Sequence, residues 1–219
     1  MCVRRDVTGT TISYSPLPEE VSINSSKEKI IEIVAGPNGS GKTTFGESYF
    51  LRTIGNAVFL NADKIASGIA PLDFEKASFQ AGRILINAVN EKVHKRESFS
   101  FESTLSGRTW ATILKEAKSK GYDVTIYFLF LKSVKTNLKR IKQRVKKGGH
   151  FVPDQDVKRR YPRCFENFWN LYRPLCADWY IFNNSGHHPK PFQNKSGYDD
   201  LNAIEQKEFA TQFLERSQI

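Results

Sequence analysis

One stretch of the sequence decides the fold: Ile30-Ile31-Glu32-Ile33-Val34-Ala35-Gly36-Pro37-Asn38-Gly39-Ser40-Gly41-Lys42-Thr43. Its last eight residues fit G-x-x-x-x-G-K-[ST], a glycine-rich turn that follows a strand and opens a helix. The β-branched run at 30–35 predicts a buried strand, and residues 44–52 are compatible with the helix. Successive N–H groups of such a turn, together with the helix N-terminus, bind phosphate. The stretch therefore predicts a nucleotide-binding loop in an α/β domain.

The residues of the loop have distinct predicted roles. Lys42 is expected to reach the β- and γ-phosphates, and the Thr43 hydroxyl is expected to bind Mg²⁺. The loop leaves the reaction open, because P-loop proteins include kinases, switches, motors and transporters. The predicted nucleotide-binding residues are Gly36, Pro37, Asn38, Gly39, Ser40, Gly41, Lys42, Thr43 and Thr44.

Length and composition indicate one globular domain. The chain has 219 residues, of which 39% are hydrophobic and 26% charged. Residues 1–27 show no period and predict an N-terminal extension, which leaves 28–219 as a single domain. The N-terminus lacks the apolar segment of a secretory signal, and no apolar run is long enough to span a membrane. Three cysteines without metal-type spacing (Cys2, Cys164 and Cys176) predict reduced thiols in a cytoplasmic protein, with packing roles for the last two.

Short apolar runs alternate with helical patterns along the rest of the chain. This alternation predicts a P-loop NTPase fold of the nucleotide-kinase type, with a parallel five-stranded sheet flanked by helices. Residues 185–198 are rich in Gly, Pro and Asn and predict a loop. The remaining predicted strands are 57–60, 98–101, 123–131 and 177–183, and the remaining predicted helices start near 63 and cover 74–94, 108–120, 134–147, 154–171 and 198–216.

Positive charge is concentrated in one segment. The net charge is +10, and residues 131–163 hold twelve Lys or Arg against two acids, Asp154 and Asp156. One interpretation is a nucleic-acid surface. Few aromatic residues interleave with the charges, which disfavours base stacking. The other is a lid, about 132–165, that carries arginines over the nucleotide while most lysines face solvent.

Polar side chains follow two predicted strands, where ligands bind in open parallel sheets. Asn61 and Asp63 follow the strand at 57–60, and Glu102, Ser103 and Thr104 follow the strand at 98–101. Asp63 is placed to act as a general base or as a Mg²⁺-linked group, and Asp is also favoured as a helix N-cap. Glu102 either binds a sugar or ribose hydroxyl, acts on the metal, or interacts with a helix dipole.

Arginine suits the charge that develops on a transferred phosphoryl group. Arg144 and one of Arg159 or Arg160 are the predicted contacts, with Arg160 assigned to catalysis and Arg159 to substrate binding. His150 either contacts a ligand or makes a structural hydrogen bond. The apolar run at 124–131 ends without a Walker B acid, which argues against motor and transporter ATPases.

In their order these motifs resemble the zeta-toxin family of P-loop kinases, in its bacterial branch of predicted ATPases. The resemblance covers residues 30–183, and the stretch at 148–153 departs from the better-known toxins. The matching pieces are residues 36–44, Asn61-Ala62-Asp63, residues 101–107, Asn137-Leu138 with Arg140 and Arg144, Gly148-Gly149-His150 with Val152-Pro153, residues 157–161, Asn167 and Ala177-Asp178.

The resemblance implies a kinase that uses ATP or GTP with Mg²⁺ and phosphorylates a hydroxyl of UDP-N-acetylglucosamine, as a toxin held by an antitoxin. It implies Asp63 as the base, and Glu102 and Thr104, with Asn61, as contacts to the nucleotide-sugar. Two competing functions remain open: a nucleic-acid-directed kinase or NTPase that uses the basic segment, and a regulatory NTPase without a small acceptor.

Overall fold

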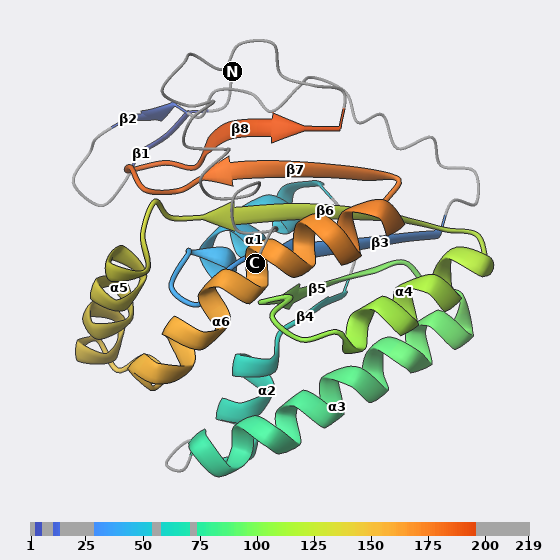
Figure 1. Ribbon diagram of the computed structural model, residues 1–219, viewed down its shortest axis with the longest axis horizontal. Coiled ribbons are helices and arrows are strands. Elements are labelled where there is room, and N and C mark those ends of the chain that lie inside the picture. The colour runs from blue at the N-terminus through green and yellow to red at the C-terminus, as the bar shows by residue number, and fades with distance from the viewer. Residues whose placement is uncertain (1–2, 6–10, 14–28, 54–57, 71–73, 196–219) are drawn as a thin grey trace.

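A six-stranded sheet forms the centre of the computed structural model, which describes residues 3–5, 11–13, 29–53, 58–70 and 74–195 (Figure 1). Five strands are parallel, as predicted, and the sixth runs antiparallel to its neighbour. The strand order is β4 (Val58–Leu60), β5 (Phe99–Ser103), β3 (Lys29–Ala35), β6 (Tyr122–Phe130), β7 (Asp178–Asn183) and β8 (Lys190–Asn194).

The sixth strand corrects the predicted loop at 185–198. Its polar and proline-rich sequence lacks the apolar alternation typical of a strand. Phe192 is nevertheless buried and packs edge-on against Phe130, with ring centroids 5.1 Å apart. Proline is tolerated there because β8 is an edge strand. A separate antiparallel pair, β1 (Val3–Arg5) and β2 (Thr11–Ser13), lies within the predicted N-terminal extension. Cys2 and the predicted helix at 198–216 lie outside the described residues.

Helices cover both faces of the sheet (Figure 1). α3, α4 and α6 lie on one face and α1 on the other, and α5 lies beyond the carboxyl ends of the parallel strands. None of the described helices combines the length and the apolar character needed to cross a membrane. The helices are α1 (Lys42–Thr53), α2 (Ala62–Ile69), α3 (Phe74–Lys95), α4 (Thr109–Ser119), α5 (Val134–Lys146) and α6 (Asp154–Asn167).

The helix predicted over 154–171 is helical throughout, but its end is not α-helical. The α-helical part stops at Asn167, and the chain continues as a π-helix over Phe168–Tyr172 and a 3₁₀ turn over Arg173–Leu175. Phe168 and Tyr172, at the two ends of the π-helix, are both fully buried in the core. Single π turns are often found at functional sites.

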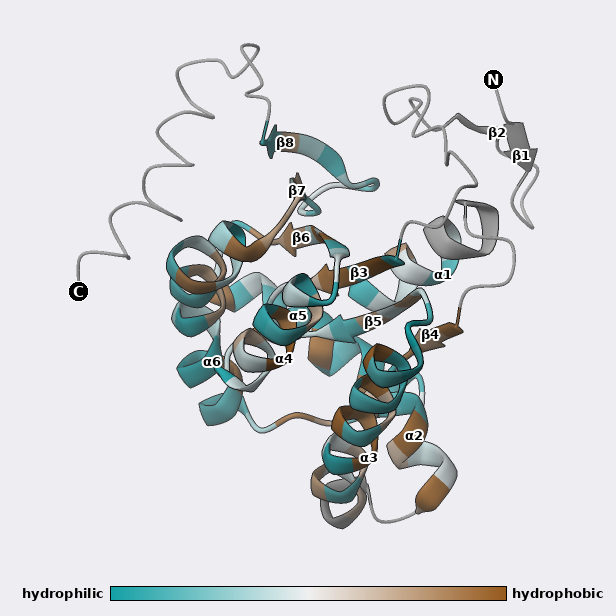
Figure 2. Ribbon diagram, turned by 90° about the vertical axis from the view of Figure 1, so that its right-hand side faces the viewer, coloured by the Kyte–Doolittle hydropathy of each residue, from teal (hydrophilic) through white to brown (hydrophobic). Residues whose placement is uncertain are grey.

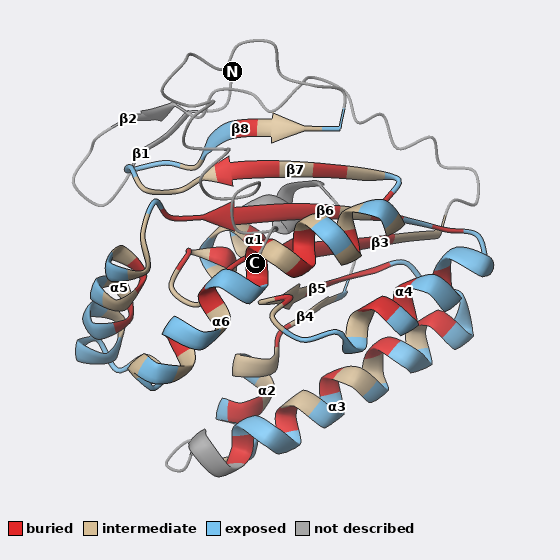
Figure 3. Ribbon diagram, viewed as in Figure 1, coloured by how far each residue is buried: buried red, intermediate tan, exposed pale blue. Residues whose placement is uncertain are grey.

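The main core lies between the sheet and α3, α4 and α6, where buried strands and buried helix faces meet (Figure 3). Apolar colouring marks β3, β4 and β6, whereas β8 is largely hydrophilic (Figure 2). Cys164 and Cys176 belong to this core, and burial raises the pKa of both thiols to about 12. Neither forms a thiolate near neutral pH, which agrees with the predicted packing roles.

One carboxyl group is buried inside the sheet, far from the ends of the strands. Glu32 lies in the middle of β3 and is 7% exposed. Its Oε1 accepts a hydrogen bond of 3.0 Å from the Tyr127 hydroxyl, and its Oε2 has no hydrogen-bond partner within the described residues. Burial raises the pKa of Glu32 to about 7, against the opposing effect of the Tyr127 hydrogen bond.

We expect Glu32→Gln to stabilise the protein at alkaline pH. The folded protein holds the Glu32 proton up to a pKa of about 7, whereas the unfolded chain loses it near 4.5. Wild-type stability should therefore fall as pH rises through this window, by about 3 kcal/mol in total, and the glutamine variant should lack that loss. Urea unfolding at pH 5 and pH 8.5 measures the difference. The exposed Glu97→Gln is the control, and equal pH dependence in both variants would contradict the assignment.

Candidate active site

The phosphate loop connects β3 to α1 at the carboxyl end of the sheet, where sequence reasoning places it (Figure 1). Gly36 has φ of +134°, and a Cβ there would overlap the carbonyl oxygen of Leu129. Only glycine can occupy this position, because both the backbone angle and the close approach of β6 exclude a side chain.

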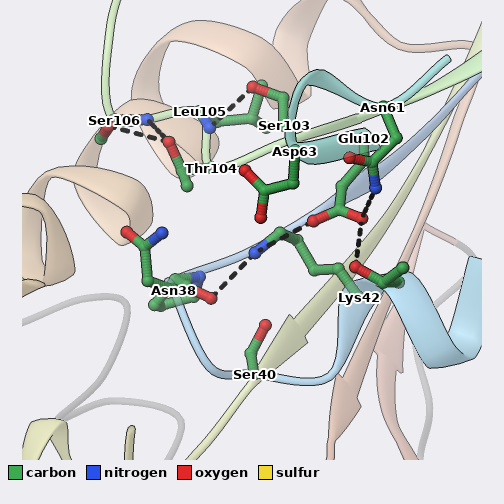
Figure 4. Close-up of polar contacts among 12 residues, drawn as sticks. Asn38, Ser40, Lys42, Asn61, Asp63, Glu102, Ser103, Thr104, Leu105 and Ser106 are labelled. Carbon is green, nitrogen blue, oxygen red and sulfur yellow. Dashed lines mark hydrogen bonds and ion pairs between the residues drawn. The ribbon is translucent and has the colours of Figure 1, made fainter. Parts of the chain in front are cut away.

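Four side chains from three elements meet at the start of α1 (Figure 4). Glu102, at the end of β5, accepts hydrogen bonds at Oε2 from the Thr43 hydroxyl, at 2.8 Å, and from Asn61 Nδ2, at 2.7 Å. The Lys42 ammonium lies 3.7 Å from Glu102 Oε1 and donates a 3.0 Å hydrogen bond to the Pro37 carbonyl. Predicted phosphate, metal and substrate residues thus contact one another at Glu102.

Asp63 faces this cluster from the first turn of α2. Its carboxylate points into the space between Lys42 and Thr104 (Figure 4). The helix N-cap is Asn61, whose Oδ1 accepts a 3.1 Å hydrogen bond from Lys64 N. The alternative interpretation of Asp63 as the cap is therefore wrong, because the cap position is already filled two residues earlier.

Glu102 has an unusual electrostatic environment. Burial raises the pKa of its carboxyl group, while the Lys42 ammonium and the hydrogen bond from Thr43 lower it. The structure therefore holds a carboxylate, a hydroxyl and an ammonium together at the phosphate loop. Such a set binds the phosphates and metal of a nucleotide.

The turn after β5 presents hydroxyl groups to the same space. Thr104 Oγ1 and Ser106 Oγ lie 2.9 Å apart, and Ser103 Oγ accepts a hydrogen bond from Leu105 N. Leu105 is fully buried and has φ of +53°, a strained angle for a non-glycine residue. Asn167 Nδ2 holds the turn from α6 by donating to the Leu105 carbonyl at 2.9 Å. The turn is thus built to keep Thr104 and Ser106 in place.

Arg144, near the end of α5, reaches toward Asp63. Its Nη1 lies 3.9 Å from Asp63 Oδ2, and its Nη2 donates a 2.8 Å hydrogen bond to the His150 carbonyl. A Cβ at Gly149 would lie 2.5 Å from Arg144 Cγ, so glycine is needed for this approach. Burial lowers the pKa of the His150 imidazole, which is therefore neutral at neutral pH.

The structure does not bring the other two predicted arginines to the cluster. Arg159 and Arg160 both pair with Asp156, at 2.6 and 3.2 Å. Within the described residues neither guanidinium forms an ion pair with Asp63 or Glu102. The lysines of the basic segment are exposed, as expected; they are Lys132, Lys135, Lys139, Lys142, Lys146, Lys147 and Lys158.

The family relationship follows from the sequence that builds this site. A sequence model of the zeta toxin family matches residues 19–186, more than half of the chain. The chain belongs to the zeta toxin family. The match includes the phosphate loop, the cluster around Glu102 and the Arg144 segment, so the predicted resemblance is confirmed.

Other proteins are similar to this member of the zeta toxin family. An uncharacterized protein of Haemophilus influenzae is 37% identical over 126 residues, which is 58% of this chain and 88% of that protein. The structure of the PezAT chromosomal toxin-antitoxin system of Streptococcus pneumoniae aligns with a TM-score of 0.58 at 14% identity, over 86% of this chain and 79% of that one. The structure of AvrRxo1-ORF1:-ORF2 with ATP aligns with a TM-score of 0.58 at 15% identity, over 78% of this chain and 59% of that one. At these identities the two structures show a shared fold.

Two residues at the loop of this zeta toxin family member were given no role by sequence reasoning. Asn137, in α5, donates a 2.6 Å hydrogen bond to the Asn38 carbonyl, and Asn184, after β7, donates a 2.8 Å bond to the Ser40 carbonyl. Asn184 is 144 positions from its partner, and nothing local in the sequence marks such a contact.

Proposed function

We propose that this protein is a kinase that transfers the γ-phosphate of ATP or GTP to a hydroxyl of a small molecule, with a UDP-N-acetyl-sugar as acceptor. The observation that carries the proposal is the contact of Lys42, Thr43 and Glu102 at the loop, with Asp63 facing it. This arrangement places a carboxylate that could bind the acceptor hydroxyl next to the loop that binds the phosphates of the nucleotide. The ATP complex of AvrRxo1-ORF1:-ORF2, which shares the fold, supports ATP as the donor.

Thr43 and Glu102 would hold Mg²⁺. Their oxygens lie 2.8 Å apart. Adjacent ligand oxygens of an octahedral Mg²⁺ with bonds of about 2.1 Å lie about 3 Å apart, so the pair fits with little movement. No cluster of three or more His, Cys, Asp or Glu suited to a metal occurs within the described residues. Mg²⁺ is often held by one carboxylate, a hydroxyl and the phosphates of the nucleotide, and it would neutralise charge developing on them.

Asp63 and Arg144 would act on the transferring group. The acceptor oxygen attacks the γ-phosphorus, the bond to the β,γ-bridging oxygen breaks, and the acceptor proton passes to the Asp63 carboxylate. Lys42 would move from the Pro37 carbonyl to the phosphates, and Arg144 would stabilise the transferred phosphoryl group. The 3.9 Å separation of Arg144 and Asp63 brings base and arginine to the same space.

The acceptor would bind between Asp63 and the Thr104 hydroxyl. Arg159 or Arg160 would reach it by a movement of α6 within the basic segment, since α5 already contacts the loop through Asn137. We assign Glu102 to the metal rather than to the sugar, because its carboxylate is already bound to Thr43 and Asn61. The PezAT structure, which shares the fold, belongs to a toxin-antitoxin system, and this supports a role as the toxin of such a pair, with an antitoxin as protein partner.

Mass spectrometry tests the proposed reaction. Purified protein is incubated with Mg²⁺, ATP or GTP, and a set of nucleotide-sugars that includes UDP-N-acetylglucosamine. We expect one acceptor to gain a single phosphate group while one nucleoside diphosphate is released for each transfer. Absence of a phosphorylated product from every nucleotide-sugar would overturn the assignment of the acceptor.

The same assay separates the competing functions. A regulatory NTPase would release phosphate in water at a rate that no acceptor changes. A nucleic-acid-directed enzyme would label DNA or RNA instead, and its binding would weaken steeply as salt rises. Either result would replace the small-molecule kinase.

A further inference from the structure

We propose that Asn137 and Asn184 are positioning residues that preset the phosphate loop for the nucleotide. The inference rests on the proposed donor site and is independent of the acceptor. Both side chains come from elements far along the chain, and each holds one carbonyl of the loop from outside.

We call each of these two side-chain hydrogen bonds to a loop carbonyl a clamp. The first clamp comes from α5. Asn137 is fully buried, and its Nδ2 donates a 2.6 Å hydrogen bond to the carbonyl oxygen of Asn38. The planar trans peptide places the N–H of Gly39 opposite that carbonyl. The clamp therefore turns the Gly39 N–H away from α5. A Cβ at Gly39 would lie 2.8 Å from the Asn137 carbonyl oxygen, so α5 packs directly on the loop.

The second clamp comes from the segment after β7. Asn184 Nδ2 donates a 2.8 Å hydrogen bond to the Ser40 carbonyl, and a Cβ at Gly41 would overlap that Nδ2. By the same geometry the Gly41 N–H is turned away from Asn184. The backbone of Asn184 is fixed independently, because its N–H donates a 2.9 Å bond to the Phe130 carbonyl.

The two N–H groups set by these clamps are available to a ligand. Within the described residues, neither Gly39 N nor Gly41 N donates a hydrogen bond to the protein. Gly39 and Gly41 have φ of +79° and +91°, angles that favour glycine. The N–H groups of a P-loop bind phosphate oxygens, so the clamps prepare two donors before the nucleotide arrives.

N–H groups that already point to the ligand raise the affinity for a nucleotide, because a mobile loop would have to be ordered on binding. We expect Asn184→Ala to weaken binding of a non-hydrolysable ATP analogue with Mg²⁺ about tenfold, and Asn137→Ala to weaken it by a similar factor. The affinity for inorganic triphosphate should fall by the same factor, since the two asparagines act only on the N–H groups that bind phosphate. Calorimetric titration measures both ligands without any acceptor.

Asn183→Ala is the matched control. Asn183 immediately precedes Asn184, and its Oδ1 accepts a 3.0 Å hydrogen bond from Ser185 N, away from the loop carbonyls. This control should keep wild-type affinity for both ligands, and thermal melting should give similar Tm values for the control and Asn184→Ala. Because Asn137 is buried, Asn184→Ala provides the test if the Asn137 variant unfolds.

Three outcomes would overturn the inference or its basis. Full affinity in Asn184→Ala would remove the positioning role while leaving the proposed function intact. The Tm of the clamp variants could fall further than that of the control, by enough to account for the lost affinity. This result would make the contacts structural only. A wild-type protein that binds neither ligand would remove the proposed donor site, and the inference with it.

Discussion

Asp63→Asn should reduce phosphoryl transfer by about 10²- to 10⁴-fold, the usual contribution of a positioned general base. Asparagine keeps the shape of the side chain but cannot accept the acceptor proton. The fold of α2 should be unaffected, because Asn61 and not Asp63 caps the helix. Nucleotide binding should persist, since the Lys42, Thr43 and Glu102 contacts do not involve Asp63. Steady-state transfer and titration with an ATP analogue measure the two effects separately.

Asp154→Asn is the control for this change. Asp154 is also in the first turn of a helix and also lies near a cation, Lys142, at 3.5 Å, but on the outside of α5 and α6. It should transfer phosphate at close to the wild-type rate. Full activity in Asp63→Asn would remove Asp63 as the base and return the choice to another acid of the site.

Arg144→Ala should lower kcat by about 10³-fold or more, in the range measured for arginines that stabilise the transferred phosphoryl group. Arg144→Lys should restore only part of this loss, since a lysine keeps the charge but lacks the planar pair of donors. Affinity for the nucleotide should change little, because the arginine acts on charge that develops in the transition state. Single-turnover transfer kinetics with both variants measure the expected order.

Lys142→Ala is the matched control on the same helix. Lys142 is exposed and pairs with Asp154, whereas Arg144 faces Asp63 and the His150 carbonyl. Loss of activity in Lys142→Ala as large as in Arg144→Ala would indicate a general effect of positive charge on α5. A loss below tenfold in Arg144→Ala would exclude a direct role at the phosphoryl group.

α5 connects the two halves of the proposed site. Asn137 contacts the phosphate loop, and Arg144, two helical turns later, reaches Asp63. Residues seven apart lie on the same face of a helix, about 10 Å from each other. A movement of α5 would therefore change the loop and the arginine together. The helix predicted as part of a lid that carries arginines also contacts the phosphate loop directly through Asn137.

The local sequence contains the information for the individual elements. The phosphate loop and the five parallel strands follow from short-range patterns, because each depends on residues within one turn or one strand. β8 and the change from α- to π-helix at Phe168 were not predicted, because neither depends on a short-range pattern. The buried side chains of these segments, Phe192, Phe168 and Tyr172, have partners distant in the chain, so local propensity does not predict these features.

Part of the site could also be anticipated from the sequence. The carboxyl ends of neighbouring parallel strands meet at one edge, so Asp63 and Glu102 were expected near the loop before any contact was known. Their different contacts were not predictable. The structure binds Glu102 to Thr43 and Asn61 and leaves Asp63 facing the open space, and this distinction divides the metal role from the base role.

The sequence by itself determined the chemistry available to this protein: a loop of backbone donors, a lysine, two acids and a set of arginines. Only the tertiary structure decided which of these groups meet. Arg144 reaches Asp63, whereas Arg159 and Arg160 bind Asp156, although all three have the same charge and lie in one basic segment. Asn137 and Asn184 hold the loop from positions about 100 and 144 residues away. The physical reason is that a side chain reaches only a few ångströms, so its partner is chosen by the packing of strands and helices and not by its neighbours in sequence.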